Sequence, residues 1–189
     1  MDNKLTETTL HQGRFLSLRQ RGQWEFCERV NSSGVVVILA LTPGNKVLFV
    51  EQYRPPVQSR VIEMPAGLAG DIAGQSDESL ETAAARELEE ETGYRAQTIR
   101  RLTTGPASSG MSSEMISFML AEGLQRVGPG GGDDSEDITV HEIALEQAGQ
   151  WLIERERAGT PADPKVYAGL WWLQHERAAL SNSSASSRR

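Results

Sequence analysis

The 189-residue chain is poor in cysteine and histidine, with one cysteine and three histidines. A single cysteine cannot form a disulfide within the chain, which fits a reducing compartment. We expect Cys27 to be a small buried residue rather than a nucleophile. The histidines are His11, His141 and His175, and we expect all three to be structural because none has the spacing of a metal-ligating pair.

The chain also lacks a basic stripe and a long apolar run, and its formal net charge is −7. Phosphate backbones are bound by clustered Lys and Arg, so we expect no nucleic-acid polymer as a partner. No apolar stretch has the length of a membrane span, and the first residues are polar. We therefore expect no signal peptide, no membrane partner and a cytoplasmic location. A small phosphorylated ligand stays compatible with this acidic protein if a metal ion supplies positive charge.

What is present is a mixture of strand-like and helix-like segments, with enough hydrophobic residues (38%) for one core. Residues 14–30 alternate between apolar and polar and predict a hairpin that turns near Gly22. Residues 34–41, a strand expected to be buried on both faces, and 46–54 are predicted as antiparallel neighbours. Further predicted elements are strands at 61–67, 98–105 and 114–124, loops at 68–77 and 127–138, and helices at 79–92, 145–159 and from 163. This mixture favours an α/β or α+β sandwich, followed by a disordered tail at 181–189.

The segment 83–94, AAARELEEETGY, places four glutamates within five positions of a predicted helix. Ser79 suits the N-terminal cap of this helix, and Gly93 suits the left-handed residue that ends it. At roughly 100° per residue, one helix face begins with small or apolar residues and continues into carboxylates. The members of that face are Leu80, Ala83, Ala84, Glu87, Glu90 and Glu91, whereas Glu89 points toward solvent. The pattern therefore predicts three carboxylates directed inward.

Grouped carboxylates that face a protein interior are costly unless positive charge neutralises them. Arg86 lies one turn before Glu90 and can pair with it, but one arginine does not neutralise three glutamates. Clustered carboxylate oxygens suit Mg²⁺ or Mn²⁺, so we expect a divalent metal cofactor. The alternative is a solvated, acidic helix end without a function.

Residues 86–94 match the core of the Nudix box, Arg-Glu-apolar-x-Glu-Glu-x-Gly-apolar, and Glu78 stands eight positions before Arg86 as the box requires. The box normally opens with a glycine, but Ile72 stands at that position. Gly67 is the counterpart of this glycine if the loop at 68–77 contains about five inserted residues. Together with the segments EQYRPP, EMPAG and SEDITVH, the box makes the chain similar to the Nudix hydrolase family. The resemblance is to its ADP-ribose pyrophosphatase and nucleoside-diphosphate-sugar hydrolase branch.

The resemblance implies a Nudix α/β/α sandwich with a mixed β-sheet over residues 33–180. An antiparallel β-hairpin extension over residues 1–32 would precede it and serve dimerisation and nucleotide contact. Such enzymes are usually homodimers with exchanged N-terminal strands. The implied reaction is metal-dependent hydrolysis of the diphosphate bond of ADP-ribose or another nucleoside-diphosphate sugar. Ser109 stands where members that act on ADP-ribose carry a proline, which favours a broader specificity.

The resemblance also implies roles for individual residues. Glu87, Glu90 and Glu91 would hold Mg²⁺, or Mn²⁺ in its place, with the carbonyl of Ala66 as a further ligand, and Glu90 would also be catalytic. Glu136 would orient or deprotonate the attacking water. The rivals of Glu136 for that role are Asp134 and Asp137. The implied substrate contacts are Trp24, Glu25, Arg29, Arg54 and Glu114.

Each of these roles has a plainer alternative. Trp24 could be core packing, Arg54 a surface arginine and Glu136 a solvated loop residue. The glycines of the loop 127–138 favour a segment that closes over the ligand. For the whole chain, the alternatives to the hydrolase are a catalytically silent Nudix-fold domain that binds a nucleotide or a protein, and an enzyme that cleaves free nucleoside triphosphates.

Overall fold

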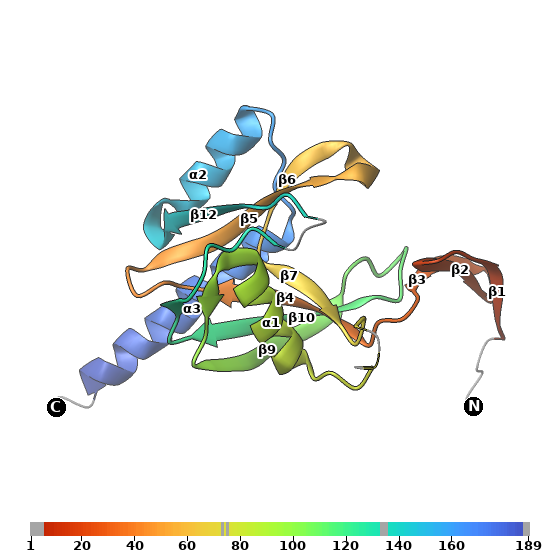
Figure 1. Ribbon diagram of the computed structural model, residues 1–189, viewed down its shortest axis with the longest axis horizontal. Coiled ribbons are helices and arrows are strands. Elements are labelled where there is room, and N and C mark those ends of the chain that lie inside the picture. Colours follow the sequence, from red (N-terminus) through yellow and green to blue (C-terminus); the bar gives the residue numbers. More distant parts are fainter. Residues whose placement is uncertain (1–5, 73, 75, 133–135, 187–189) are drawn as a thin grey trace.

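The computed structural model describes residues 6–72, 74, 76–132 and 136–186, of which 180–186 are described by their backbone alone (Figure 1). The strands are β1 (Glu7–Gln12), β2 (Leu16–Arg21), β3 (Trp24–Arg29), β4 (Gly34–Ala40), β5 (Lys46–Arg54), β6 (Ser59–Glu63), β7 (Ala66–Ala69), β8 (Tyr94–Arg95), β9 (Thr98–Pro106), β10 (Met115–Glu122), β11 (Gln125–Arg126) and β12 (Thr139–Ala144). The helices are α1 (Leu80–Thr92), α2 (Leu145–Arg157) and α3 (Lys165–Ser186), with a short 3₁₀ turn at Pro55–Val57.

A mixed sheet of order β7-β4-β10-β9 forms the centre of the molecule, and β12-β5-β6 forms a second sheet. The central sheet is mixed because β10 runs parallel to β4, whereas β7 and β9 run antiparallel to their neighbours. Figure 1 shows α1 and α3 on opposite sides of this arrangement. The expected mixed α/β sandwich is therefore confirmed.

β4 separates two apolar cores, as expected for a strand buried on both faces. Its side chains alternate, so Val36 and Ile38 pack toward Ala84 and Leu88 of α1. Val37 and Leu39 belong to the other core, where they meet the second sheet and two helices. Partners on that side include Phe49, Ile62, Leu152, Val166, Leu170 and Leu173. Both faces of β4 are thus covered by apolar layers.

The predicted pairing of 34–41 with 46–54 is wrong. The turn between them forms, with the Thr42 amide donating to the Lys46 carbonyl at 2.9 Å, but β4 and β5 then diverge into different sheets. Only the isolated bridge between Leu41 and Val47 joins them. The two hydrogen-bonding edges of β4 are occupied by β10 and β7, and β5 instead helps to cover one face of β4.

The N-terminal sheet has the order β1-β2-β3 and projects from one end of the molecule in Figure 1. The predicted hairpin is present as β2 and β3, with Gly22 at a φ of 61° in its turn. β1 was not expected, because ETTLHQ has no alternation of apolar and polar residues. Cys27 is partly rather than fully buried, and its backbone pairs with Met111 and Ser113 of the 107–114 loop. These bonds attach the N-terminal sheet to the central domain.

Helix α3 continues to Ser186, so the tail predicted as disordered from residue 181 is largely helical, and residues 187–189 lie outside the described part. Propagating an existing helix adds one hydrogen bond per residue, whereas starting a helix is costly, so a polar segment can prolong a helix that the core has nucleated. Within the described residues, no helix is both long and apolar enough to cross a membrane.

Candidate active site on the acidic helix

The helix α1 is fixed at both ends by the residues that the sequence predicts. The Ser79 hydroxyl accepts a hydrogen bond from the Thr82 amide at 3.1 Å, and Gly93 ends the helix in the left-handed conformation at a φ of 73°. Ala84 and Leu88 are completely buried against the central sheet. Because this packing fixes the rotation of the helix, it also fixes the directions of the glutamates.

The glutamates of α1 differ in exposure. Glu91 is buried with 2% of its surface exposed, and the side chains of Glu87 and Glu90 are 14% and 50% exposed. The inward direction is therefore confirmed for Glu91 and Glu87, whereas Glu90 lies at the rim. Glu89 points to another side, where it pairs with Arg95 at 2.8 Å.

Burial dominates the electrostatics of the two inner carboxylates. Burial raises the pKa of Glu87 to about 7, although the charge of Arg86 opposes the shift. Burial also raises the pKa of Glu91 well above its usual range, against the hydrogen bond from the Ala66 amide, and the charges of Glu87, Glu136 and Glu63 add to the rise. Both carboxylates are therefore costly to ionise where they stand, because burial removes the water that would stabilise their charge.

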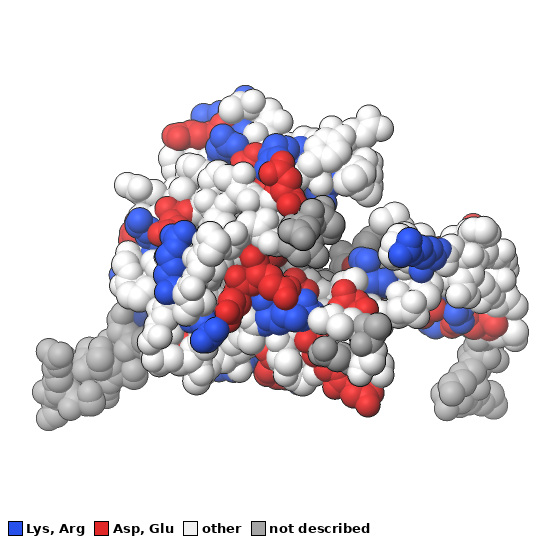
Figure 2. Space-filling view, viewed as in Figure 1, with Lys and Arg blue, Asp and Glu red and all other residues white. Residues whose placement is uncertain are grey.

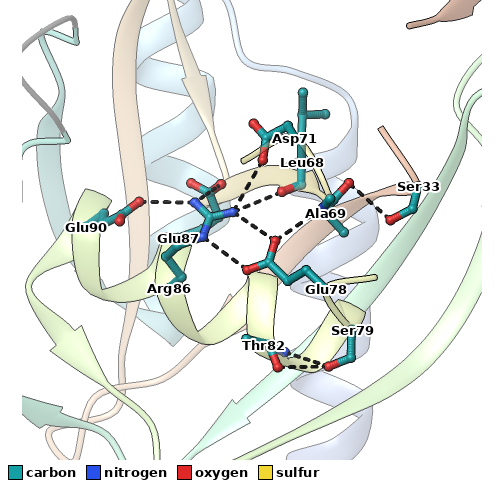
Figure 3. A network of polar contacts seen from close by, with 11 residues as sticks. Ser33, Leu68, Ala69, Asp71, Glu78, Ser79, Thr82, Arg86, Glu87 and Glu90 are labelled. Carbon is teal, nitrogen blue, oxygen red and sulfur yellow. Dashed lines mark hydrogen bonds and ion pairs between the residues drawn. The ribbon is translucent and has the colours of Figure 1, made fainter. Parts of the chain in front are cut away.

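Arg86 is the cation at the centre of this acidic group (Figure 3). It donates to Glu87 at 2.8 Å, to Glu90 at 3.2 Å and to the Leu68 carbonyl at 3.0 Å. Glu78, whose side chain is only 2% exposed, accepts from Arg86 at 3.2 Å. The bond from Arg86 lowers the pKa of Glu78 despite its burial. Glu78 thus holds Arg86 in place, and the predicted pairing of Arg86 with Glu90 is present.

β7 packs closely against the acidic helix. A Cβ atom on Gly67 would lie 2.0 Å from Cδ of Glu87, so any other residue there would displace the Glu87 carboxylate. This contact supports Gly67 as the counterpart of the glycine that opens the Nudix box. The neighbouring Ala66 contacts Glu91 through its amide, which donates to Oε2 at 3.0 Å.

The glycine-rich loop after β11 is bound to the C-terminal end of α1. The Gly131 amide donates to the Glu91 carbonyl at 2.8 Å, and the Gly132 amide to the Glu90 carbonyl at 3.0 Å. Gly130 has a φ of +71°, and a Cβ atom there would lie 2.4 Å from the carbonyl carbon of Thr92. Gly130 and Gly132 of this loop therefore serve close packing, which the composition alone did not indicate.

Glu136 lies beside the acidic helix. Its Oε2 is 2.4 Å from where a Cβ atom of Gly132 would stand, and its charge acts on the pKa of Glu91. Of the two rival acids, Asp137 is paired with Arg60 at 2.8 Å, and Asp134 lies outside the described residues. Figure 2 shows acidic side chains concentrated in the middle of the face where Figure 1 places α1, with basic side chains directly beside them.

Arg54 is held close to this acidic group by a residue that the sequence reading missed. Its Nη2 and Nε donate to Oε2 of Glu63 at 2.6 and 2.9 Å, and Glu63 acts electrostatically on Glu91. The position of Glu63 directly before the Met64–Gly67 turn was the available signal. Arg54 is therefore fixed by Glu63 and is not an isolated surface arginine.

The remaining predicted substrate contacts lie near the N-terminal sheet. Arg29 and Glu114 pair at 2.8 Å and line a cavity of about 210 Å³ at the start of β4 and β10. Trp24 is 65% exposed, which rules out core packing within this chain, and it lines a second cavity of about 250 Å³ with Phe26. Glu25, also exposed, lies beside Trp24 on β3. Figure 1 shows β3 to one side of α1.

The carboxylates on α1 are the right chemical type of ligand for a divalent cation, but they are not arranged around one common point. In the part of the chain that the structure describes, no three His, Cys, Asp or Glu side chains are grouped closely enough to hold a metal ion. Glu87 and Glu90 are bonded to Arg86, and Glu91 to Ala66. The donors are nevertheless hard carboxylate oxygens, and a cation would relieve the desolvation and repulsion that raise two of their pKa values.

The mixed α/β fold carries its carboxylates on one helix, α1, which spans most of the segment that matches the Nudix box. The NUDIX domain model matches residues 31–168, and the chain therefore belongs to the Nudix hydrolase family. It is a pyrophosphohydrolase-type enzyme of that family.

Two relatives are similar to the chain in sequence, and one solved structure is similar to it in fold. The chain is 33% identical over 158 residues to the methanol dehydrogenase activator of Bacillus methanolicus, covering 83% of this chain and 80% of the relative. It is 35% identical over 152 residues to the ADP-ribose pyrophosphatase of Bacillus subtilis (strain 168), covering 80% and 77%. A crystal structure of an ADP compounds hydrolase shares the fold, with a TM-score of 0.71 and 18% identity over 93% of this chain and 94% of that one.

Proposed function

We propose that the protein hydrolyses the diphosphate bond of a nucleoside diphosphate linked to a sugar, such as ADP-ribose. The products would be a nucleoside monophosphate and a sugar phosphate. The observation that carries this proposal is the group of buried carboxylates on α1, with raised pKa values for Glu87 and Glu91. A diphosphate can approach such a group only together with cations. The similarity to an ADP-ribose pyrophosphatase favours this class of substrate.

Mg²⁺, or Mn²⁺ in its place, would be held by Glu87, Glu90 and Glu91, with the Ala66 carbonyl as a further donor. When bound, the metal supplies Lewis-acid stabilisation of charge on the phosphate oxygens and makes a water easier to deprotonate. Glu90 is the most accessible of the three carboxylates, so it is the one best placed to face the substrate.

The other side chains bind and orient. Glu136 orients the attacking water and accepts its proton. Arg54 exchanges its bond to Glu63 for the diphosphate, whose oxygens match the fork of an arginine. Arg29 and Glu114 lie together in a cavity of suitable polarity for a sugar. Trp24, with Glu25 beside it, presents an exposed ring on which a base can stack.

A substrate panel tests the proposal directly. ADP-ribose, other sugar nucleotides, dinucleoside polyphosphates and deoxynucleoside triphosphates are incubated with Mg²⁺, and the products are identified. We expect the sugar nucleotides to be cleaved fastest, with AMP and ribose 5-phosphate formed from ADP-ribose. EDTA should abolish turnover, and added Mg²⁺ should restore it. Faster cleavage of triphosphates, or binding of a nucleotide without turnover, would overturn the proposal.

Matched variants on α1 separate the metal site from general acidity. Glu91→Gln and Glu90→Gln should lower kcat by roughly 10²-fold or more, as expected when charge stabilisation of the transition state is lost. Glu89→Gln removes the same charge from the same helix but only affects an exposed pair with Arg95, so its activity should remain near wild type. Equal activity in all three variants would contradict the assigned site.

We also propose that residues 1–32 form an extension that joins two copies of the chain and contacts the nucleotide. Large hydrophobic side chains are exposed on it, with Phe15, Leu16 and Trp24 more than half exposed. The sheet projects from the domain and offers these side chains to a partner (Figure 1). Residues 33–180 form the catalytic domain in this proposal.

A further inference from the structure

Arg60 on β6 connects the second sheet to the loop that carries Glu136. On one side its Nε donates to Oε1 of Glu51 at 3.1 Å and its Nη2 to the Glu51 carbonyl at 2.9 Å. On the other side its Nη1 donates to Oδ2 of Asp137 at 2.8 Å. Nη2 also reaches the Asp137 carbonyl at 3.2 Å and the Thr139 hydroxyl at 3.3 Å. All three nitrogens of the guanidinium group therefore donate hydrogen bonds.

Glu51 is a firm anchor for this arginine. It is buried, with 7% of its surface exposed, in the middle of the second sheet. His141 of β12 lies 2.9 Å from its Oε2, and Arg155 of α2 donates to the same oxygen at 2.8 Å. The carboxylate is thus held from three elements, and Arg60 reaches outward from it to the loop.

The loop is also fixed on its other side. The amides of Gly131 and Gly132 are bonded to carbonyls at the end of α1, and the Ile138 amide faces the Gly131 carbonyl at 3.4 Å. Glu136 therefore stands between two attachments, one to the acidic helix and one to Arg60. The second attachment begins at the residue next to Glu136 in the chain.

We propose that Arg60 is a positioning residue for hydrolysis, which holds Glu136 at the acidic site through Asp137 and Thr139. The inference rests on the role proposed above for Glu136. Arginine suits this task because its planar group presents donors in a fixed fork, whereas lysine offers one compact ammonium. The Asp137 side chain is 86% exposed, so its pair with Arg60 adds little to stability and acts mainly on geometry.

Steady-state kinetics of Arg60→Lys test the proposal, with Arg155→Gln as the matched control. Both variants remove guanidinium bonds to Glu51, two from Arg60 and one from Arg155, but only Arg60 also contacts the loop. We expect Arg60→Lys to lower kcat roughly 10- to 100-fold, because small misplacements of a reacting group have effects of that size. KM should change less than about twofold, since substrate contacts are kept. Asp137→Ala should lower kcat in the same way, and Arg155→Gln should not.

A double variant distinguishes a positioning role of Arg60 from a general loss of structure. In Glu136→Gln, whose own rate is low, adding Arg60→Lys should leave the residual rate unchanged, because the two residues act through one step. A further fall of about tenfold in that background, or an unchanged kcat in Arg60→Lys alone, would overturn the inference. If Glu136→Gln itself retained wild-type kcat, the proposed role of Glu136 would fail instead. Substrate turnover by the wild type is a separate test of the proposed hydrolase function.

Discussion

At the scale of single residues, Glu87 combines burial with negative charge in a way that favours ligand binding over stability. Its side chain is 14% exposed and lies against Gly67, where a Cβ atom would overlap the Glu87 carboxylate. Burial outweighs the effect of Arg86, so the pKa of Glu87 stays raised to about 7. A residue held under such conditions destabilises the protein until a cation binds.

We therefore predict that Glu87→Gln is more stable than the wild type in EDTA at pH 8, although it is inactive. The gain should be on the order of 1–3 kcal/mol in urea unfolding, from the size of the pKa rise. The folded protein protonates Glu87 below a pH of about 7, so the gain shrinks as the pH falls below 7 and vanishes below the unfolded pKa near 4.5. Mg²⁺ should stabilise the wild type more than the variant. A less stable variant in EDTA would contradict this account of the site.

At the scale of elements, the contact between α1 and the loop after β11 places the proposed base next to the acidic helix. The amides of the loop satisfy carbonyls that the end of a helix leaves without partners. The approach is so close that both sides of it are glycine, Gly93 on the helix and Gly130 on the loop. A glycine-rich composition thus reflects tight packing at this junction.

We predict that Gly130→Ala destabilises the protein by more than about 1 kcal/mol, because the positive φ and the crowded Cβ position both oppose alanine. It should also lower kcat, since the loop that carries Glu136 must shift. The control is Gly149→Ala within α2, where a Cβ atom meets nothing within 4 Å. That variant should be more stable than the wild type by about 0.5–1 kcal/mol. Chemical unfolding and kinetics check both, and equal behaviour of the two variants would refute the packing role of Gly130.

At the scale of the whole molecule, the N-terminal sheet leaves large apolar side chains exposed. β3 is attached to the 107–114 loop by two backbone bonds, while Phe15 and Leu16 remain 65% and 51% exposed. Exposed apolar side chains grouped on one projecting sheet are typical of an interaction surface. This arrangement supports the proposed dimer.

We predict that light scattering after size exclusion gives twice the mass of one chain for the wild type. Phe15→Ser combined with Leu16→Ser should give the mass of one chain, because the apolar contact between copies is lost. Trp171→Ser on α3 is the control, as Trp171 is similarly exposed at 57% but lies on another element, and it should leave the dimer intact. A monomeric wild type, or dissociation caused by Trp171→Ser alone, would contradict the proposed interface.

Much of the fold was predictable where local patterns decide it. Ser79 and Gly93 mark the ends of α1, and Gly22 marks the hairpin. The pairing of β4 was not predictable, because adjacent strands joined by a short turn usually pair, and only the full set of strands shows that β7 and β10 take both edges.

The sequence by itself determined the periodicity that turns Glu87 and Glu91 inward, together with the arginine that pairs with Glu87. Tertiary structure alone decided what surrounds them: Gly67 against Glu87, Ala66 and Glu63 near Glu91, and Arg60 tied to the loop of Glu136. The physical reason is that helix phase follows from local spacing of residues. Charge, burial and loop position depend on which distant segments the packed core brings together.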